Sequence, residues 1–276
     1  MIEQIWLSID FDFFSPEAPE WDWGHLATSN EELVWTLRAK NLKAMGLDPV
    51  LATYSNNPSF DTFWDILNKN GYDFSRVKKF GISDCHSEAM KFYGVDWTGR
   101  SKPGRTLLNI DAHHDLGYGI HDLSAVDSGN WHIALHKHRP KLISKILYPT
   151  WEKQESAFPM EITALHVMDH LDKSRVSAAK WSEEEIQKTA GKVDGVFICR
   201  SSLFVPPWKD YQFIDFVSEA GMITGMKPTL YGIIDPMIAR PFDMRKVEED
   251  IDMEKCVAEP QVERESNERH TGDSNN

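Results

Sequence analysis

The sequence predicts an α/β fold: a three-layer arrangement with a mainly parallel sheet and helices on both of its faces. Short apolar runs recur along the chain, as the buried strands of such sheets do, and segments with apolar residues at helical spacing lie between them. Strands that alternate with helices in this way favour a parallel sheet covered on both sides. At 276 residues, of which 41% are hydrophobic, the chain can bury one substantial core. We therefore expect a single domain over residues 1–245.

The individual elements follow from the same patterns. Strands are expected where apolar residues run together, at residues 5–7, 77–82, 106–108, 162–167, 193–199 and 230–234. A helix over residues 31–45 is expected to end at Gly46, and one over residues 60–70 at Gly71, because glycine readily closes a helix. A third helix over residues 181–190 has Ser182 as its N-cap and acids in its first turn.

The composition argues against several classes of function. A net charge of −13 disfavours sequence-independent binding to nucleic acid or to a membrane surface, which both require basic patches, and it favours cationic substrates. The three cysteines are scattered and form no CxxC pair, so neither a disulfide framework nor a zinc ribbon is expected. No signal peptide or membrane span is recognisable, which leads us to expect a cytoplasmic protein. From residue 246 onward polar and acidic residues dominate, which predicts a disordered tail over residues 246–276.

Acidic and histidine side chains gather directly after three of the predicted strands. They lie in the segments Ser-Ile-Asp-Phe-Asp (8–12), Ser-Asp-Cys-His-Ser (83–87) and Asn-Ile-Asp-Ala-His-His-Asp (109–115). Side chains alternate between the two faces of a strand, so Asp10 and Asp12 share one side, as do Asp111, His113 and Asp115 while the strand stays extended. Ligands of open α/β sheets collect beyond the carboxyl ends of the strands. We therefore expect the three segments to form one site.

The charges of this site indicate metal ions. Four aspartates in one half-buried pocket repel one another and are costly to desolvate unless cations compensate them, and two divalent ions balance four carboxylates. Oxygen ligands with some imidazole suit Mn²⁺, and less well Mg²⁺, while the lack of thiolates gives no reason for structural Zn²⁺. We therefore predict a two-metal hydrolytic centre. Its predicted ligands are Asp10, Asp12, His86, Asp111, His113 and Asp115.

These segments allow other interpretations. An Asp-x-Asp pair after a strand also suits a helix cap or the nucleophile of a haloacid-dehalogenase-type phosphatase. The run from Asp111 to Asp115 is harder to explain in either way, because packing does not call for so many ionisable groups in succession. A binding module without catalysis is the least economical alternative.

Four segments resemble motifs of the arginase (ureohydrolase) superfamily. Residues 111–115 resemble its Asp-Ala-His-x-Asp motif and residues 8–12 its Ser-x-Asp-x-Asp motif, while residues 83–87 are similar to Gly-Gly-Asp-His-Ser with one residue inserted. Residues 128–132, Ser-Gly-Asn-Trp-His, are similar to the Ser-Gly-Asn-x-His segment, whose histidine is assigned to proton transfer. The resemblance implies an arginase-like fold, two Mn²⁺ ions, and catalytic roles for His132, as the proton shuttle, and Asp115.

The order of the motifs departs from that family. In arginases the Ser-x-Asp-x-Asp strand follows the other two metal motifs, whereas here it comes first, which a parallel sheet tolerates because circular permutation leaves the strand in place. We find no clear equivalent of the family's Asp-Pro after the second aspartate, and the loop after Asp115 is longer. The permuted order and the aromatic-rich motifs look closer to a divergent branch that includes peptide arginases of ribosomal peptide pathways, which convert peptide-bound arginine to ornithine.

Candidate substrate-binding residues surround the predicted metal ligands. Ser128 and Asn130 belong to the Ser-Gly-Asn segment. Trp21 and His25 follow the first aspartates and suit an aromatic wall at the mouth of a pocket, with core packing as the alternative. Arg200, after the strand at 193–199, suits either a substrate carboxylate or carbonyl, or a structural ion pair.

Other histidines carry weaker expectations. His166 and His170 are four residues apart, as in a helical metal pair, but residues 162–167 read better as a strand. His136 and His138 are expected on a solvated basic face.

The resulting prediction is a hydrolase that converts peptide-bound arginine to ornithine and urea. The alternatives are a small-molecule ureohydrolase of the arginase or agmatinase type and a deacetylase-like amidohydrolase with one zinc. The expected partner is an arginine-containing peptide or a small guanidino compound, with neither nucleic acid nor a membrane. The oligomeric state stays open, a homo-oligomer included.

Overall fold

The computed structural model describes residues 4–16, 31–54, 59–95, 105–117, 125–151 and 173–249. The chain divides into two compact units. The first, which we call the sheet unit, comprises residues 1–22 and 53–240, and the second, the helical unit, comprises residues 23–52 and 241–276. This division differs from the single domain expected over residues 1–245.

The sheet unit is built on one parallel sheet. Within the described residues it has seven strands in the order β5-β4-β3-β1-β6-β2-β7, and every pair of neighbours is parallel. The strands are β1 (Gln4–Asp10), β2 (Lys79–Ser83), β3 (Arg105–Ile110), β4 (Ile143–Tyr148), β5 (Val176–Lys180), β6 (Lys192–Cys199) and β7 (Thr229–Leu230). β1 lies at the centre, and its residue Ile9 is in register with Ile110 of β3 and Ile198 of β6. The carboxyl ends of these three strands therefore meet at the same edge.

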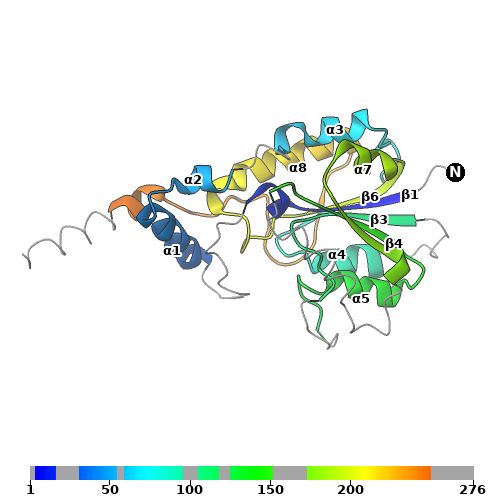
Figure 1. Cartoon of the computed structure of the whole chain (residues 1–276), viewed down its shortest axis with the longest axis horizontal. Coiled ribbons are helices and arrows are strands. Elements are labelled where there is room, and N and C mark those ends of the chain that lie inside the picture. The colour runs from blue at the N-terminus through cyan, green and yellow to red at the C-terminus, as the bar shows by residue number, and fades with distance from the viewer. Residues whose placement is uncertain are drawn as a thin grey trace, which may run out of the picture. The chain divides into compact units, whose positions relative to one another are not determined.

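Helices cover both faces of the sheet. α3 (Phe63–Lys69), α7 (Glu183–Lys188) and α8 (Asp210–Thr224) lie on one face, and α4 (Glu88–Met90) and α5 (Trp131–His138) lie on the other (Figure 1). Short helical turns complete the unit, at Phe11–Phe14, Phe60–Thr62, Lys91–Val95, Lys173–Arg175 and Pro207–Lys209. The expected three-layer α/β fold is confirmed.

The alternation of β1 assigns its side chains to the two layers. Ile5, Leu7 and Ile9 belong to the core cluster that includes the aromatic residues of α3 and α8. Trp6 belongs to a second cluster, which contains the buried residues of α4 and α5. Because side chains alternate along a strand, Asp10 shares the face of Trp6 and points toward the α4 and α5 layer.

Most predicted elements of the sheet unit are confirmed. β1, β2, β3 and β6 overlap the predicted runs, and the predicted strand at 162–167 lies outside the described residues. Gly71, after α3, has the left-handed φ of 94° that closes a helix, and the Ser182 hydroxyl caps α7 by accepting from the backbone N–H of Glu185.

The predicted buried strand at residues 230–234 is wrong in its extent and its burial. β7 ends at Leu230, because Gly232 takes a left-handed φ of 89° that no extended strand contains. Ile233 is 100% exposed, so this apolar run is not part of the core. The sequence patterns also missed β4, β5 and α8.

The helical unit contains α1 (Glu31–Ala44) and α2 (Pro49–Ala52). α1 buries Trp35 and Leu42, and Gly46 follows it with a φ of 74°, as predicted. Residues 244–249 are also helical, with Val247 buried and Glu248 paired with Lys43 at 2.5 Å. The start of the predicted tail is therefore ordered, while residues 250–276 lie outside the described part of the chain. Among the described helices, none combines the length and the apolar character that crossing a bilayer requires.

Candidate metal centre

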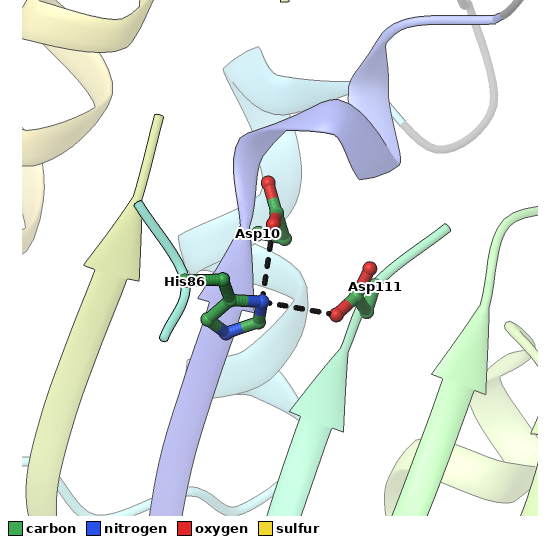
Figure 2. Close-up of side chains that lie close together, drawn as sticks. All are labelled: Asp10, His86 and Asp111. Carbon is green, nitrogen blue, oxygen red and sulfur yellow. Dashed lines mark ion pairs between the residues drawn. The ribbon is translucent and has the colours of Figure 1, made fainter. Parts of the chain in front are cut away.

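The predicted metal ligands come together at the carboxyl ends of the central strands. Asp10 is the last residue of β1, Asp111 directly follows β3, and His86 lies in the loop between β2 and α4. Figure 2 shows the His86 ring pointing toward the carboxylates of Asp10 and Asp111. Segments that are distant in the sequence are thus brought to the same edge by the parallel order of β3, β1, β6 and β2.

One half of the site is built around His86. Its Nδ1 atom lies 3.0 Å from Asp10 Oδ2, 3.2 Å from Asp111 Oδ2 and 3.0 Å from Asp115 Oδ2. A ring nitrogen carries at most one hydrogen, so it cannot satisfy three carboxylates with good hydrogen bonds. We call these four residues the His86 group. Their arrangement, with three oxygens and one nitrogen converging in a buried place, is that of ligands around a cation.

The other ring nitrogen of His86 is held by Ser8. The Ser8 hydroxyl lies 2.9 Å from Nε2. A hydrogen bond at Nε2 orients the ring and leaves Nδ1 for the carboxylates or a metal, as is usual for metal-binding histidines. Asp10 is fixed in a similar way, because the hydroxyl of Ser201 donates to its Oδ2 at 2.5 Å. Neither serine was singled out from the sequence as a support for a ligand.

The second half of the site is built around His113. Its Nδ1 atom lies 2.9 Å from Asp12 Oδ2 and 3.8 Å from Asp111 Oδ1. Asp12, Asp111 and His113 form a second set of residues that could hold a metal ion, and we call them the His113 group. Asp111 belongs to both groups: its Oδ2 faces His86 and its Oδ1 faces His113. A carboxylate shared in this way could contribute one oxygen to each of two neighbouring ions.

The crowding of acids shifts their protonation. Burial raises the pKa of Asp12 well above its usual value, and the charges of Asp10 and Asp111 add to this effect. Burial, with the charge of Asp111, likewise raises the pKa of Asp115 to about 7. Burial disfavours the charged form of His86, yet its carboxylate neighbours outweigh this and raise its pKa well above the usual range. The buried negative charge of the cluster is therefore unfavourable unless bound protons or metal ions neutralise it.

The donor set fits divalent ions of the manganese class. It offers carboxylate oxygens and two imidazoles, a combination that suits Mn²⁺ better than the soft ions that prefer sulfur. The two described cysteines do not join it: Cys85 is exposed, and burial raises the pKa of the Cys199 thiol well above its usual value. The chemistry of the residues thus fits the metals that were predicted.

His132 is enclosed at the start of α5. It lies in the first turn of α5, its side chain is fully buried, and Nδ1 is 3.2 Å from the backbone oxygen of His114. Burial, with the neighbouring His136, lowers the pKa of His132 well below its usual value, so the ring is neutral at neutral pH. Its role as a proton shuttle stays a prediction.

The predicted substrate-binding residues fall into three cases. Asn130 is buried and shapes its own loop, because its amide accepts from the backbone N–H of Asp127 and donates to the carbonyl of Ala125. Ser128, in the same loop, is half-buried. Trp21 and His25 lie outside the described residues, as do His166 and His170.

Arg200 forms the structural ion pair that was the alternative to substrate binding. Its side chain is 1% exposed, and Nε donates to Asp84 at 2.5 Å while Nη1 lies 3.3 Å from Asp210. Asp84 belongs to the loop that carries His86, so this pair ties that loop to the start of α8.

His136 corrects another expectation. Instead of lying on a solvated face it is buried, with Nε2 2.8 Å from the Ser144 hydroxyl, because α5 packs against the sheet over its first six residues. His138 is exposed, as expected.

Two aromatic residues contact the site in ways that the sequence patterns did not predict. The ring of Phe204 lies 4.7 Å from that of His113, on the half-exposed side of the site. The indole of Trp131 donates to Asp115. Both contacts depend on how the chain folds in three dimensions, which the local sequence patterns do not contain.

Comparison of the chain with protein-family models, with curated proteins and with solved structures finds no match in any of the three.

Proposed function

We propose that this protein is a dinuclear metal-dependent hydrolase that cleaves a guanidino group, and that its substrate is arginine within a peptide. The observation that carries the proposal is the position of Asp111, whose two oxygens face two separate carboxylate and histidine groups. The resemblance of four segments to ureohydrolase motifs supports the choice of reaction.

The two groups suggest a division of labour among the residues. The His86 group would hold one ion and the His113 group the other, with Asp111 contributing to both. Bound divalent ions lower the pKa of a water molecule toward neutrality, which supplies hydroxide without a strong protein base. Hydrolysis of a guanidino group gives urea and a primary amine.

The amine must gain a proton before it leaves. By resemblance His132 is the residue for this task. Its Nε2 atom is buried without a hydrogen-bond partner among the described residues, so it is the ring atom that would carry the proton. The low pKa of His132 means that the ring would have to take up this proton during turnover rather than store it beforehand.

Two observations support peptide-bound arginine over the free amino acid. Residues 116–127 differ in length and content from the loop with which free-arginine enzymes read the α-amino and α-carboxylate groups. The aromatic-rich motifs resemble those of peptide arginases. The net charge of −13 favours a cationic substrate in either case.

A deacetylase-like amidohydrolase with a single zinc is the main competitor. A single-zinc enzyme needs only one group of ligands, so this alternative does not account for the positions of Asp12 and His113. Their closeness to Asp111 supports the two-metal interpretation.

The reducing cytoplasm is the compartment that we infer for this activity. Cys85 and Cys199, both described, are free thiols, and Cys85 directly precedes His86. An exposed thiol beside a metal ligand is better preserved where thiols stay reduced.

The test of the proposal is a product assay. The Mn²⁺-loaded protein is incubated with free arginine, agmatine, an arginine-containing peptide and an acetyl-lysine peptide, and urea and acetate are measured directly. We expect urea from the peptide and little from free arginine. The Asp12→Asn variant, prepared in the same way, controls for urea made by a contaminating enzyme.

Each other outcome has a defined meaning. Urea only from free arginine or agmatine would make the protein a small-molecule ureohydrolase. Acetate without urea would overturn the guanidino assignment and favour the deacetylase alternative.

A further inference from the structure

Trp131 makes a direct contact with the His86 group. It is the first residue of α5 and is fully buried. Its indole Nε1–H donates to Asp115 Oδ2 at 2.6 Å, and the same oxygen lies 3.0 Å from His86 Nδ1. The indole ring also packs on the His86 ring, with 4.6 Å between the ring centroids. One side chain thus touches two members of the His86 group.

The backbone at Asp115 explains why such a contact is required. Asp115 has a φ of 53°, in the left-handed region that residues with a Cβ seldom adopt. Such conformations persist only where the surroundings hold them in place, and they cluster at functional sites. Without restraint, the carboxylate of Asp115 would not be kept facing His86.

The start of α5 supplies the restraint. The backbone N–H of His132 donates to the Asp115 carbonyl at 3.2 Å, and the N–H of Gly117 donates to the Gly129 carbonyl at 2.8 Å. Together with the indole bond, these contacts attach both the backbone and the carboxylate of Asp115 to residues 129–132. Of the three, only the indole bond reaches the oxygen that faces His86.

We propose that Trp131 is a positioning residue for metal binding: its indole N–H fixes Asp115 so that Oδ2 is presented to the His86 group. This inference rests on the proposed metal centre. The positive end of the indole N–H also offsets part of the negative charge on Oδ2. Asp115 would therefore attract a cation less strongly, but with its carboxylate held in a fixed orientation. Hydrogen-bond partners behind metal ligands commonly change affinity by about 10- to 100-fold when they are removed.

The experiment compares two tryptophan variants. Trp131→Phe keeps an aromatic ring against His86 but removes the N–H donor. Trp64→Phe is the matched control, because Trp64 is also fully buried and its Nε1–H donates to a backbone carbonyl, that of Phe216, at 3.2 Å. Trp64 lies in α3, on the opposite face of the sheet (Figure 1).

Metal binding is the readout, measured as Mn²⁺ bound per chain against free Mn²⁺, with the electron paramagnetic resonance spectrum of the coupled ions. For Trp131→Phe we expect one of the two dissociation constants to rise at least about tenfold and the coupled signal to weaken. The Trp64→Phe variant should keep both constants and the spectrum, whatever its stability.

A double variant separates positioning from packing. If Trp131 acts through Asp115, Trp131→Phe in an Asp115→Asn background should add no further loss of affinity. Additive losses would overturn the inference, as would wild-type constants and an unchanged spectrum for Trp131→Phe alone.

Two further results keep the test decisive. A wild-type protein that binds no ions would refute the proposed function itself. A wild-type protein that binds two ions, with unchanged dissociation constants in Trp131→Phe, would refute only the role of Trp131. If Trp131→Phe does not fold, the ¹H–¹⁵N resonance of the Trp131 indole is followed by NMR in the wild-type protein instead. That resonance should move when Mg²⁺ is added, and a constant position would contradict the inference.

Discussion

The two halves of the candidate metal centre use the same kinds of residue in opposite surroundings. The His86 side chain is 0% exposed and is enclosed by Ser8, Trp131 and three carboxylates. The His113 side chain is 27% exposed and has Phe204 beside it. The difference indicates that the His86 group belongs to the framework of the sheet unit, while the His113 side chain is partly open to solvent.

The largest effect is expected where the two halves meet. Asp111→Asn removes charge from both groups at once, so we expect both ions and all urea formation to be lost. Metal analysis and the urea assay measure this. Asp194→Asn is a matched control, since Asp194 is a buried aspartate of β6 that pairs with Lys78 and Arg105 outside the site. Retention of two ions by Asp111→Asn would mean that Asp111 is not shared.

Substitution of each histidine tests the comparison directly. His86→Asn leaves buried carboxylates without their partner, which costs about 3 kcal/mol or more of folding stability even without metal. His113→Asn, at a partly exposed position, should lower stability much less while it still removes one ion and the activity. Chemical denaturation in EDTA gives the two free energies of unfolding. Equal losses of stability would show that the two halves do not differ as their burial suggests.

The pH dependence of the metal-free protein probes the enclosed half. The pKa of Asp115 is raised from 3.8 to about 7 in the folded state, chiefly by burial. The folded protein therefore binds a proton that the unfolded chain has lost between pH 4 and 7, and stability falls as the pH rises through this window.

Because other groups titrate in the same range, the measurement is made relative to Asp115→Asn. The wild type should lose up to a few kcal/mol of stability against this variant between pH 4 and 7 in EDTA. Saturating Mn²⁺ should remove the difference in slope, since the ion replaces the proton. If the stability difference between the wild type and Asp115→Asn in EDTA does not change with pH, the raised pKa of Asp115 is contradicted.

The smallest effect is expected on the open side. Phe204→Ala should raise KM for an arginine-containing peptide by several-fold, roughly 1 kcal/mol, because it removes an aromatic contact beside His113. Metal content and kcat should stay close to the wild type. Tyr211→Ala, at an exposed aromatic residue of α8, is the control. Loss of metal in Phe204→Ala would instead make Phe204 part of the framework.

The sequence was informative where chemistry and strand ends coincide. The acids after β1 and β3, and His86 after β2, could be placed at one edge because parallel strands end together. The closeness of all six predicted ligands follows from that single rule. The strand patterns were weaker for β5, whose Val-Ser-Ala-Ala-Lys segment has few large apolar residues, and for β4, where Lys145 interrupts the apolar run to pair with Glu185.

Burial was the quantity that the sequence could not supply. Residues 230–234 are apolar but largely exposed, while His132 and His136 are polar but enclosed. Which face of α5 packs on the sheet depends on how β3 and β4 are arranged beside it. This arrangement is set by the tertiary fold and cannot be read from the sequence of α5 alone. The indole bond from Trp131 to Asp115 was missed for the same reason.

The central place of β1 has a consequence for how the site is made during synthesis. Ser201 and the Asp10 carboxylate that it contacts are 191 residues apart in the chain. β1 leaves the ribosome early, but its neighbour β6 leaves much later, and such non-local pairing delays folding. During this time Asp10 and Asp12 have no finished sheet to hold them. The complete set of candidate ligands and their supports therefore forms only after β6 has emerged, so the proposed metal ions should bind late rather than to the first part of the nascent chain.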